Sequence, residues 1–211
     1  MTDVRSQISA VRRTLGTRTL EAGEARVSTL SQVYDTDQDD LWDVVTSPER
    51  IARWFLPLEG ELKPGGHYQL RGNAGGTITR CDRPHGYAAT WEFGGQVSWI
   101  EVTLTPAGAG RTRFSLEHVA HVDDDLWDRF GPGATGLGWD SALLGLANHL
   151  ADPGAVAPGP DELTAWLTSE DGRTLLRGSA DAWAEAEILA GGDPAAARRH
   201  ADTSYAAYTG G

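Results

Sequence analysis

The sequence predicts an α+β domain, because its hydrophobic period changes from helical to alternating and back to helical. Residues 60–121 alternate in short segments separated by turn residues, which is typical of an antiparallel meander without crossover helices. Before them, residues 25–34 are rich in β-branched side chains and predict a strand. After them, residues 135–150 place apolar side chains on one stripe and predict a long amphipathic helix.

Two short helices are expected between the first strand and the meander. The Asp-Thr-Asp stretch at 35–37 offers side-chain oxygens that can cap the first helix. Ser47 is a natural cap for the second helix, and Pro48 suits its first position because no amide hydrogen is needed there. This second helix is expected to carry Trp54 and Phe55 before it ends at Pro57.

Five strands are predicted in the meander, and in each the apolar residues recur at every second position. Their sequences are HYQLRG, GTITRCD, YAATWEF, QVSWIEVTLTP and RTRFSLEHVAH. Alternate side chains of a strand point to one face, so these apolar rows are expected to share an interior. Arg80 alternates with Ile78 and is expected inside, whereas Glu92 and Glu117 are expected outside.

The chain divides into an N-terminal arm (1–24), the domain (25–150), a Pro/Gly/Ala-rich linker (151–160) and a helical C-terminal extension (161–211). The extension is too short to enclose a core alone, yet it is rich in apolar side chains that need cover. Two surfaces could bury these side chains: the outer face of the domain, or the same extension of a second copy. The homodimer is the preferred alternative, because one patch then serves both subunits.

Composition excludes several classes of function. The net charge of −12 argues against nucleic acid or an anionic membrane surface as the main partner. Cys81 is the single cysteine, which excludes an intramolecular disulfide and a cysteine-rich zinc site. The sequence has no apolar run typical of a signal peptide or a membrane span, so we expect a cytoplasmic protein without membrane insertion.

No metal, phosphate or catalytic motif is legible. His118 and His121 lie three apart on a predicted strand, so they diverge, and Asp123–Asp125 is expected to cap the next helix. The glycine-rich residues 72–76 lie between two strands, which favours a hairpin over a phosphate loop. GxSxG, HExxH, CxxC and Walker sequences are absent, and no cofactor is predicted.

Several segments taken together resemble the SRPBCC (START-like, Bet v 1-like helix-grip) superfamily over roughly residues 25–150. They are LWDVVTSPERIARWF, GGHYQL, GGTITRCDRP, ATWEF and GWDSALLGLANHL. Within the superfamily they are similar to the branch of activators of the heat-shock-protein-90 ATPase, and the C-terminal tail is similar to those of bacterial single-domain members. The resemblance implies a curved sheet wrapped around the long helix, with an apolar cavity between them.

The resemblance leaves the activity open, because the superfamily includes lipid carriers, aromatase/cyclases and co-chaperones. Our first hypothesis is a protein that binds a small apolar or amphipathic molecule in the cavity. Trp54 and Phe55 would form its rim or serve as core packing; His118 would be its polar group or a hydrogen-bonded core histidine. The expected lining is Trp54, Phe55, Tyr68, Leu70, Arg80, Trp91, Ile100, Leu116, His118, Trp139 and Leu143.

Two alternatives use the same fold. One is a polyketide cyclase, dehydratase or isomerase, in which the cavity positions a reactive chain and His118 or Arg80 gives acid–base or oxyanion help. The other is a co-chaperone-like interaction protein.

Overall fold

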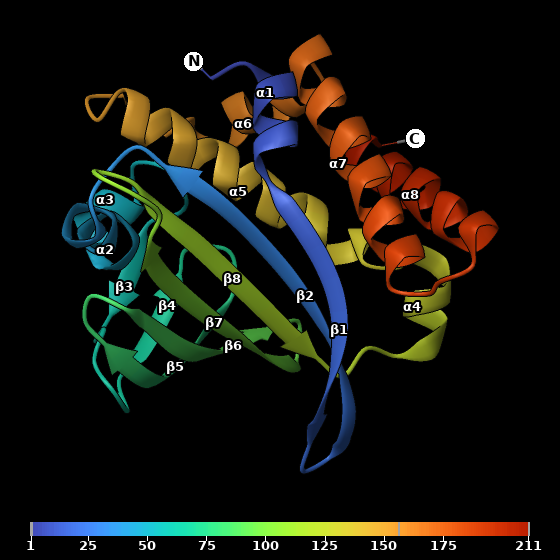
Figure 1. Cartoon of the computed structure of the whole chain (residues 1–211), viewed down its shortest axis with the longest axis horizontal. Helices are drawn as coiled ribbons and strands as arrows, with labels where there is room; N and C mark the ends of the chain where they lie inside the picture. The colour runs from blue at the N-terminus through green and yellow to red at the C-terminus, as the bar shows by residue number, and fades with distance from the viewer. Residues whose placement is uncertain (1, 156, 211) are drawn as a thin grey trace.

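The computed structural model describes residues 2–155 and 157–210, and within them it has an eight-stranded antiparallel sheet (Figure 1). The strand order is β1-β2-β8-β7-β6-β5-β4-β3. The strands are β1 (Arg12–Leu20), β2 (Gly23–Tyr34), β3 (Leu58–Gly60), β4 (His67–Leu70), β5 (Gly75–Asp82), β6 (Gly86–Phe93), β7 (Gln96–Pro106) and β8 (Thr112–Ala120). The helices are α1 (Val4–Ala10), α2 (Gln38–Thr46), α3 (Pro48–Ile51), α4 (Asp124–Phe130), α5 (Gly133–Ala151), α6 (Pro160–Leu167), α7 (Glu170–Leu189) and α8 (Pro194–Thr209).

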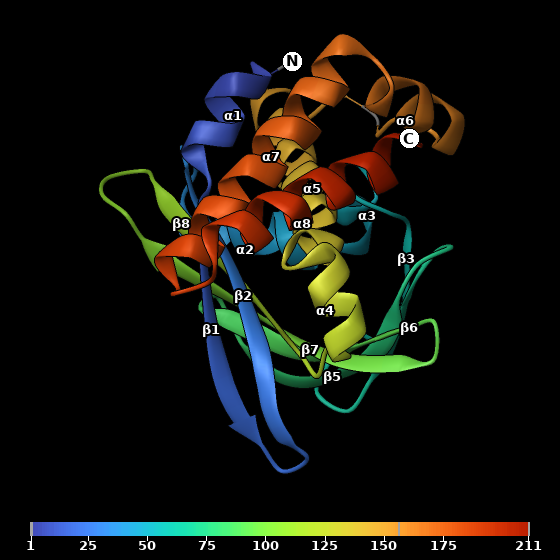
Figure 2. The same cartoon turned by 90° about the vertical axis from the view of Figure 1, so that its right-hand side faces the viewer.

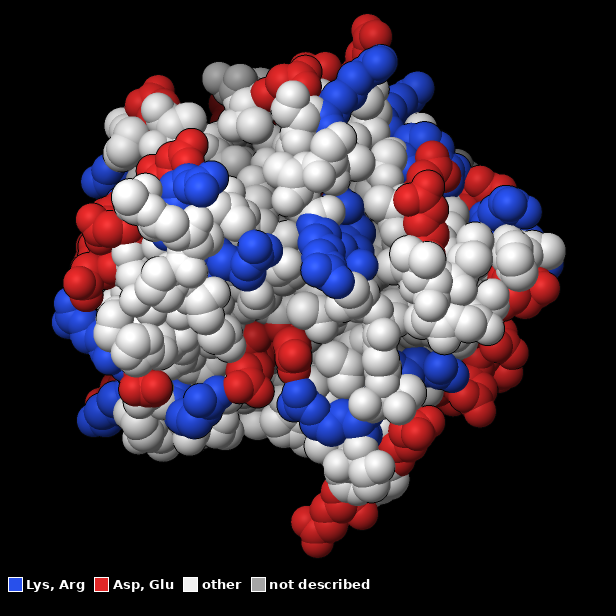
Figure 3. Space-filling view, viewed as in Figure 1, with Lys and Arg blue, Asp and Glu red and all other residues white. Residues whose placement is uncertain are grey.

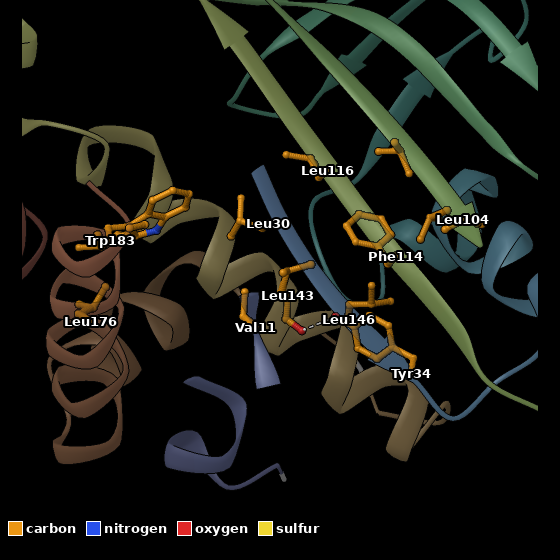
Figure 4. Close-up of a cluster of buried hydrophobic side chains, with 14 of the residues drawn as sticks. Val11, Leu30, Tyr34, Leu104, Phe114, Leu116, Leu143, Leu146, Leu176 and Trp183 are labelled. Atoms are coloured by element: carbon orange, nitrogen blue, oxygen red, sulfur yellow. Dashed lines mark hydrogen bonds between the residues drawn. The ribbon is translucent and has the colours of Figure 1, made fainter. Parts of the chain in front are cut away.

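The helices gather on one side of the curved sheet, and the long helix α5 crosses its concave face (Figures 1 and 2). This arrangement confirms the predicted α+β fold with a sheet wrapped around a long helix. Side chains at alternate positions of the central strands fill the space beneath α5. Figure 4 shows Leu30, Leu104, Phe114 and Leu116 of the sheet with Leu143 and Leu146 of α5, and Leu176 and Trp183 of α7.

The helix pair before the meander begins as predicted and ends earlier. Asp37 caps α2 by accepting a hydrogen bond from the amide of Asp40 (2.9 Å), and Pro48 opens α3. Helix α3 stops at Ile51, so Trp54 and Phe55 lie in the turn that follows and not in the helix. Hydrogen-bonded turns continue from Ile51 to Phe55, and Pro57 restricts only Leu56, the residue directly before it.

The N-terminal segment is a correction to the expected arm. Residues 12–20 form β1, which pairs with β2 from Arg12 opposite Ser31 to Leu20 opposite Gly23. The sequence does not predict this strand, because its outward face is polar and its inward face mixes Arg13 with Leu15. Of the expected arm 1–24, Met1 lies outside the described residues.

The C-terminal extension packs on its own chain. Helix α7 lies along α5 and α1, and α8 lies along α7 and α4 (Figure 2). Its apolar side chains Leu175, Leu176 and Trp183 are fully buried by these contacts. A close approach makes this possible, because a Cβ at Gly136 would lie 2.4 Å from the indole nitrogen of Trp183. These apolar side chains of the extension are therefore covered within one chain, and the homodimer stays a prediction.

A buried ion pair joins three elements at this junction. Asp140 of α5 accepts two hydrogen bonds from Arg13 of β1, with Nη2–Oδ1 at 2.7 Å and Nε–Oδ2 at 3.0 Å. Ser179 and Trp183 of α7 also donate to Oδ2 of the same carboxylate. The side chains of Arg13 and Asp140 are 4% and 1% exposed. A charge so deeply buried is stable only while its partners remain, so this carboxylate fixes the positions of β1, α5 and α7.

We predict that Arg13→Met lowers the free energy of unfolding by about 3–5 kcal/mol, because it leaves the Asp140 carboxylate buried without its cation. Urea denaturation followed by tryptophan fluorescence measures the change. Arg18→Met is the matched control: Arg18 pairs with Glu117 on the surface, and its loss should cost at most about 1 kcal/mol. Equal losses in the two variants would contradict the role assigned to the buried pair.

Candidate functional site

The apolar interior is divided into two clusters of buried side chains. The larger lies between α5, α2, α7 and strands β2, β7 and β8. The smaller consists of Tyr68, Leu70, Ile78, Ala89 and Ile100 on strands β4 to β7. Tyr87 and Trp139 pack against both clusters, and each keeps some accessible surface. The residues at the boundary between the clusters are therefore less completely buried than those inside either cluster.

Five half-buried aromatic side chains lie at this boundary, which we call the aromatic seam: Trp54, Phe55, Tyr87, Trp91 and Trp139. Trp54 stacks on Phe55 with ring centroids 5.6 Å apart, and Phe55 stacks on Trp139 at 6.3 Å. Trp91 of β6 meets Trp139 of α5 at 4.8 Å with a tilt of 55°. The seam thus brings together the turn after α3, the long helix and the sheet.

Backbone contacts hold the turn after α3 against α5. A Cβ at Gly145 of α5 would lie 2.2 Å from the carbonyl oxygen of Trp54, so only glycine allows this approach. The indole N–H of Trp54 donates to the carbonyl of Val44 at 3.1 Å. Trp54 is therefore anchored at both its backbone and its ring, whereas Phe55 has no polar group to anchor its ring.

His118 lies behind the seam as a buried histidine with both nitrogens bonded. The indole N–H of Trp139 donates to Nδ1 at 3.2 Å, so Nδ1 accepts and Nε2 carries the proton. Nε2 then donates to the hydroxyl of Ser98 at 2.8 Å, and Ser98 donates to the carbonyl of Trp91 at 3.0 Å. Burial lowers the pKa of His118 to about 4, so the ring is neutral at pH 7. Of the two interpretations of His118, the hydrogen-bonded core histidine matches this geometry.

Arg80 does not point inward, which corrects the sequence prediction. The register of β5 against β6 shifts between Ile78 and Arg80, and this irregularity breaks the alternation on which the prediction depended. Arg80 is exposed and pairs with Glu101.

Charges of both signs are interspersed over the face of the molecule in Figure 3.

The other predicted lining residues lie in the interior but on different sides of the seam. Tyr68, Leu70 and Ile100 belong to the smaller cluster, whereas Leu116 and Leu143 belong to the larger. The predicted lining omitted Tyr87, although its alternation with Trp91 placed it on the inward face. This alternation is enough to predict Tyr87 as a lining residue, but nothing in the sequence shows that its side chain packs against two clusters.

The expected helix cap and the divergence of the two histidines are both found. Asp123 accepts from the amides of Asp125 and Leu126 at 3.0 and 3.3 Å and begins α4. His118 is buried beneath α5, while His121 is exposed and contacts the carbonyl of Glu24. Among residues 2–155 and 157–210, no three His, Cys, Asp or Glu side chains form a group that could hold a metal ion. No helix in the same residues is long and apolar enough to cross a membrane.

Comparison with known families decides the classification. Residues 35–151 match the model of the family described as activator of Hsp90 ATPase homolog 1-like protein. The chain belongs to this family. The resemblance to the SRPBCC superfamily and to its heat-shock-protein-90 activator branch is thereby confirmed. No curated protein sequence matches the chain.

Similar solved structures cover more of this chain than the family model does. The solution structure of CalU16 from Micromonospora echinospora is 33% identical, with a TM-score of 0.68, over 87% of this chain and 97% of that one. Its crystal structure gives 31% identity and a TM-score of 0.65, over 85% and 98%. This coverage exceeds residues 35–151, so the likeness includes parts of the N-terminal segment and the C-terminal extension. MLL2253 from Mesorhizobium loti shares the fold at 18% identity and a TM-score of 0.54, over 62% and 100%.

We predict that His118 makes the unfolding free energy depend on pH below its ordinary pKa of 6.5. The unfolded chain takes up a proton below pH 6.5, whereas the folded chain resists it down to about pH 4. Stability is therefore complete above pH 6.5 and falls by about 3 kcal/mol as the pH drops to 4. Denaturation at a series of pH values should show this loss in the wild type.

His118→Gln cannot titrate and should remove that part of the pH dependence. His121→Gln, at an exposed site on the same strand, should leave it in place. Identical pH profiles for the wild type and His118→Gln would show that His118 is not the desolvated group described above.

Proposed function

We propose that the protein binds a small, largely apolar molecule at the aromatic seam, between the concave face of the sheet and α5. The observation that carries the proposal is that five aromatic residues pack against the two buried clusters and are themselves only half-buried. Ligand pockets are lined mainly by apolar and aromatic groups with few polar ones, which is the composition of the seam. The proposed ligand is a small apolar or amphipathic molecule met in the cytoplasm.

The seam is closed in this structure, because its rings contact one another. A ligand would take the place of contacts such as Phe55 on Trp139, at 6.3 Å between ring centroids. Trp91 and Trp139 belong to a strand and a long helix, whereas Phe55 lies in an irregular turn without a polar anchor. We propose that Phe55 moves aside when the ligand enters.

Binding is better supported than catalysis. The cyclase-like alternative assigned acid–base or oxyanion roles to His118 and Arg80. Arg80 is outside the interior, and His118 is neutral with both nitrogens already bonded. Positioning alone can promote the folding of a reactive chain, and such a reaction would use the same seam. Such a reaction would depend on which ligand is bound, and it would occur in addition to the proposed binding.

We predict that the neutral dye N-phenyl-1-naphthylamine binds at the seam and shifts the indole N–H signals of Trp54, Trp91 and Trp139 in nitrogen-15 NMR spectra. These rings would contact the dye or repack around it. Single Trp→Phe variants assign each signal.

The indole signals of Trp99 and Trp166 are the internal controls. Trp99 faces outward from β7 and meets His121, and Trp166 packs with the buried residues near α1. Their signals should not move. Shifts confined to Trp99 or Trp166, or no binding of the dye, would refute the proposed site.

A further inference from the structure

Tyr87 is the one residue of the seam that carries a hydroxyl group. It lies on β6 opposite Val102 of β7, and its side chain faces the interior with the other inward residues of that row. Its ring meets Trp42 of α2 edge to face, with centroids 6.4 Å apart and planes at 78°. It packs against both buried clusters and so lies at the boundary between them.

The hydroxyl of Tyr87 differs from those of the other inward tyrosines. Tyr68 donates to the carbonyl of Thr90 at 2.7 Å, and Tyr34 lies 3.1 Å from the amide oxygen of Gln32. Tyr208 donates to the carbonyl of Ala134 at 3.2 Å. Tyr87 has no hydrogen-bond partner in the described part of the chain, and its oxygen is not among the fully covered polar atoms. This oxygen therefore keeps some accessible surface although no group of the described residues bonds to it.

The hydroxyl is nevertheless poorly hydrated. Desolvation raises the pKa of Tyr87 well above its usual value, so the group keeps its proton and remains a donor at any physiological pH. A desolvated donor without an acceptor is unfavourable, and such groups are usually satisfied by water or a ligand. An accessible, protonated and unpaired hydroxyl is the feature expected of a polar anchor in an otherwise apolar site.

Two of the three indole N–H groups of the seam are already bonded within the protein. The indole N–H of Trp54 is bonded to Val44 and that of Trp139 to His118. The indole N–H of Trp91 has no partner in residues 2–155 and 157–210, but Trp91 precedes the exposed hairpin at Phe93, where water can satisfy it. Tyr87 is therefore the desolvated donor left to recognise a ligand.

We infer that Tyr87 donates a hydrogen bond to an oxygen acceptor of the bound molecule, which makes the ligand class an apolar compound that carries an acceptor such as a carbonyl group. This inference rests on the proposed function, because it concerns the same seam. It adds that a pure hydrocarbon is not the preferred ligand. The acceptor satisfies the hydroxyl, while the rings of the seam cover the rest of the molecule.

Two probes of nearly equal shape test the inference: 2-acetylnaphthalene, which has a carbonyl, and 2-ethylnaphthalene, which has none. Isothermal titration calorimetry gives the affinity of each. The wild type should bind the ketone more tightly. Tyr87→Phe should weaken ketone binding about five- to tenfold and leave hydrocarbon binding unchanged.

Tyr68→Phe is the matched control, because the Tyr68 hydroxyl is already bonded to Thr90. It should change the affinity for both probes by the same factor. Thermal unfolding adds a second readout: Tyr87→Phe removes no bond and should not lower Tm, whereas Tyr68→Phe should lower it.

Three results would overturn the inference. Equal effects of Tyr87→Phe on the two probes would show that the hydroxyl does not contact the carbonyl. A loss of Tm in Tyr87→Phe as large as in Tyr68→Phe would show that the hydroxyl has a partner within the protein. Failure of the wild type to bind either probe would overturn the proposed function together with the anchor, which distinguishes it from the first two results.

Discussion

The carboxylate of Asp140 is the interaction on which the arrangement of the helices depends. It is almost completely buried, and it is bonded to Arg13 of β1 and to Ser179 and Trp183 of α7. Neighbouring residues of a helix point in directions about 100° apart, so Trp139 faces the sheet while Asp140 faces β1 and α7. The contacts that fix Asp140 therefore also fix the rotation of α5, and with it the ring that separates the two apolar clusters.

The C-terminal extension stabilises the position of α5. The family model ends at residue 151, but α7 supplies two of the groups that satisfy Asp140. Trp183 packs where Gly136 leaves room, so α5 is covered on the side away from the sheet. The likeness to CalU16 reaches beyond the family model in the same direction. The extension thus supports the helix that carries Trp139, at a distance from the seam itself.

Much of the fold could be predicted because local periodicity reflects which face is buried. The five meander strands and α5 show this signal strongly. Strand β1 does not, since Arg13 on its inward face is polar and is balanced only by Asp140, far away in the sequence. Arg80 was misplaced because a register shift at one residue reverses every later side chain. For the candidate site, alternation identified inward residues such as Trp91 and Tyr87. It could not show that their rings meet between two clusters, which depends on tertiary packing.

The central claim is that a ligand occupies the aromatic seam. A crystal structure of the protein grown with N-phenyl-1-naphthylamine tests this claim most directly. The account predicts electron density for the dye between Trp139, Trp91 and Phe55, with the Phe55 ring moved away from its 6.3 Å contact with Trp139. Density for the dye only on the open surface between α1 and α7, which includes Ile8 and Gly178, would contradict the claim. So would a structure in which the rings of the seam stay stacked as they are here.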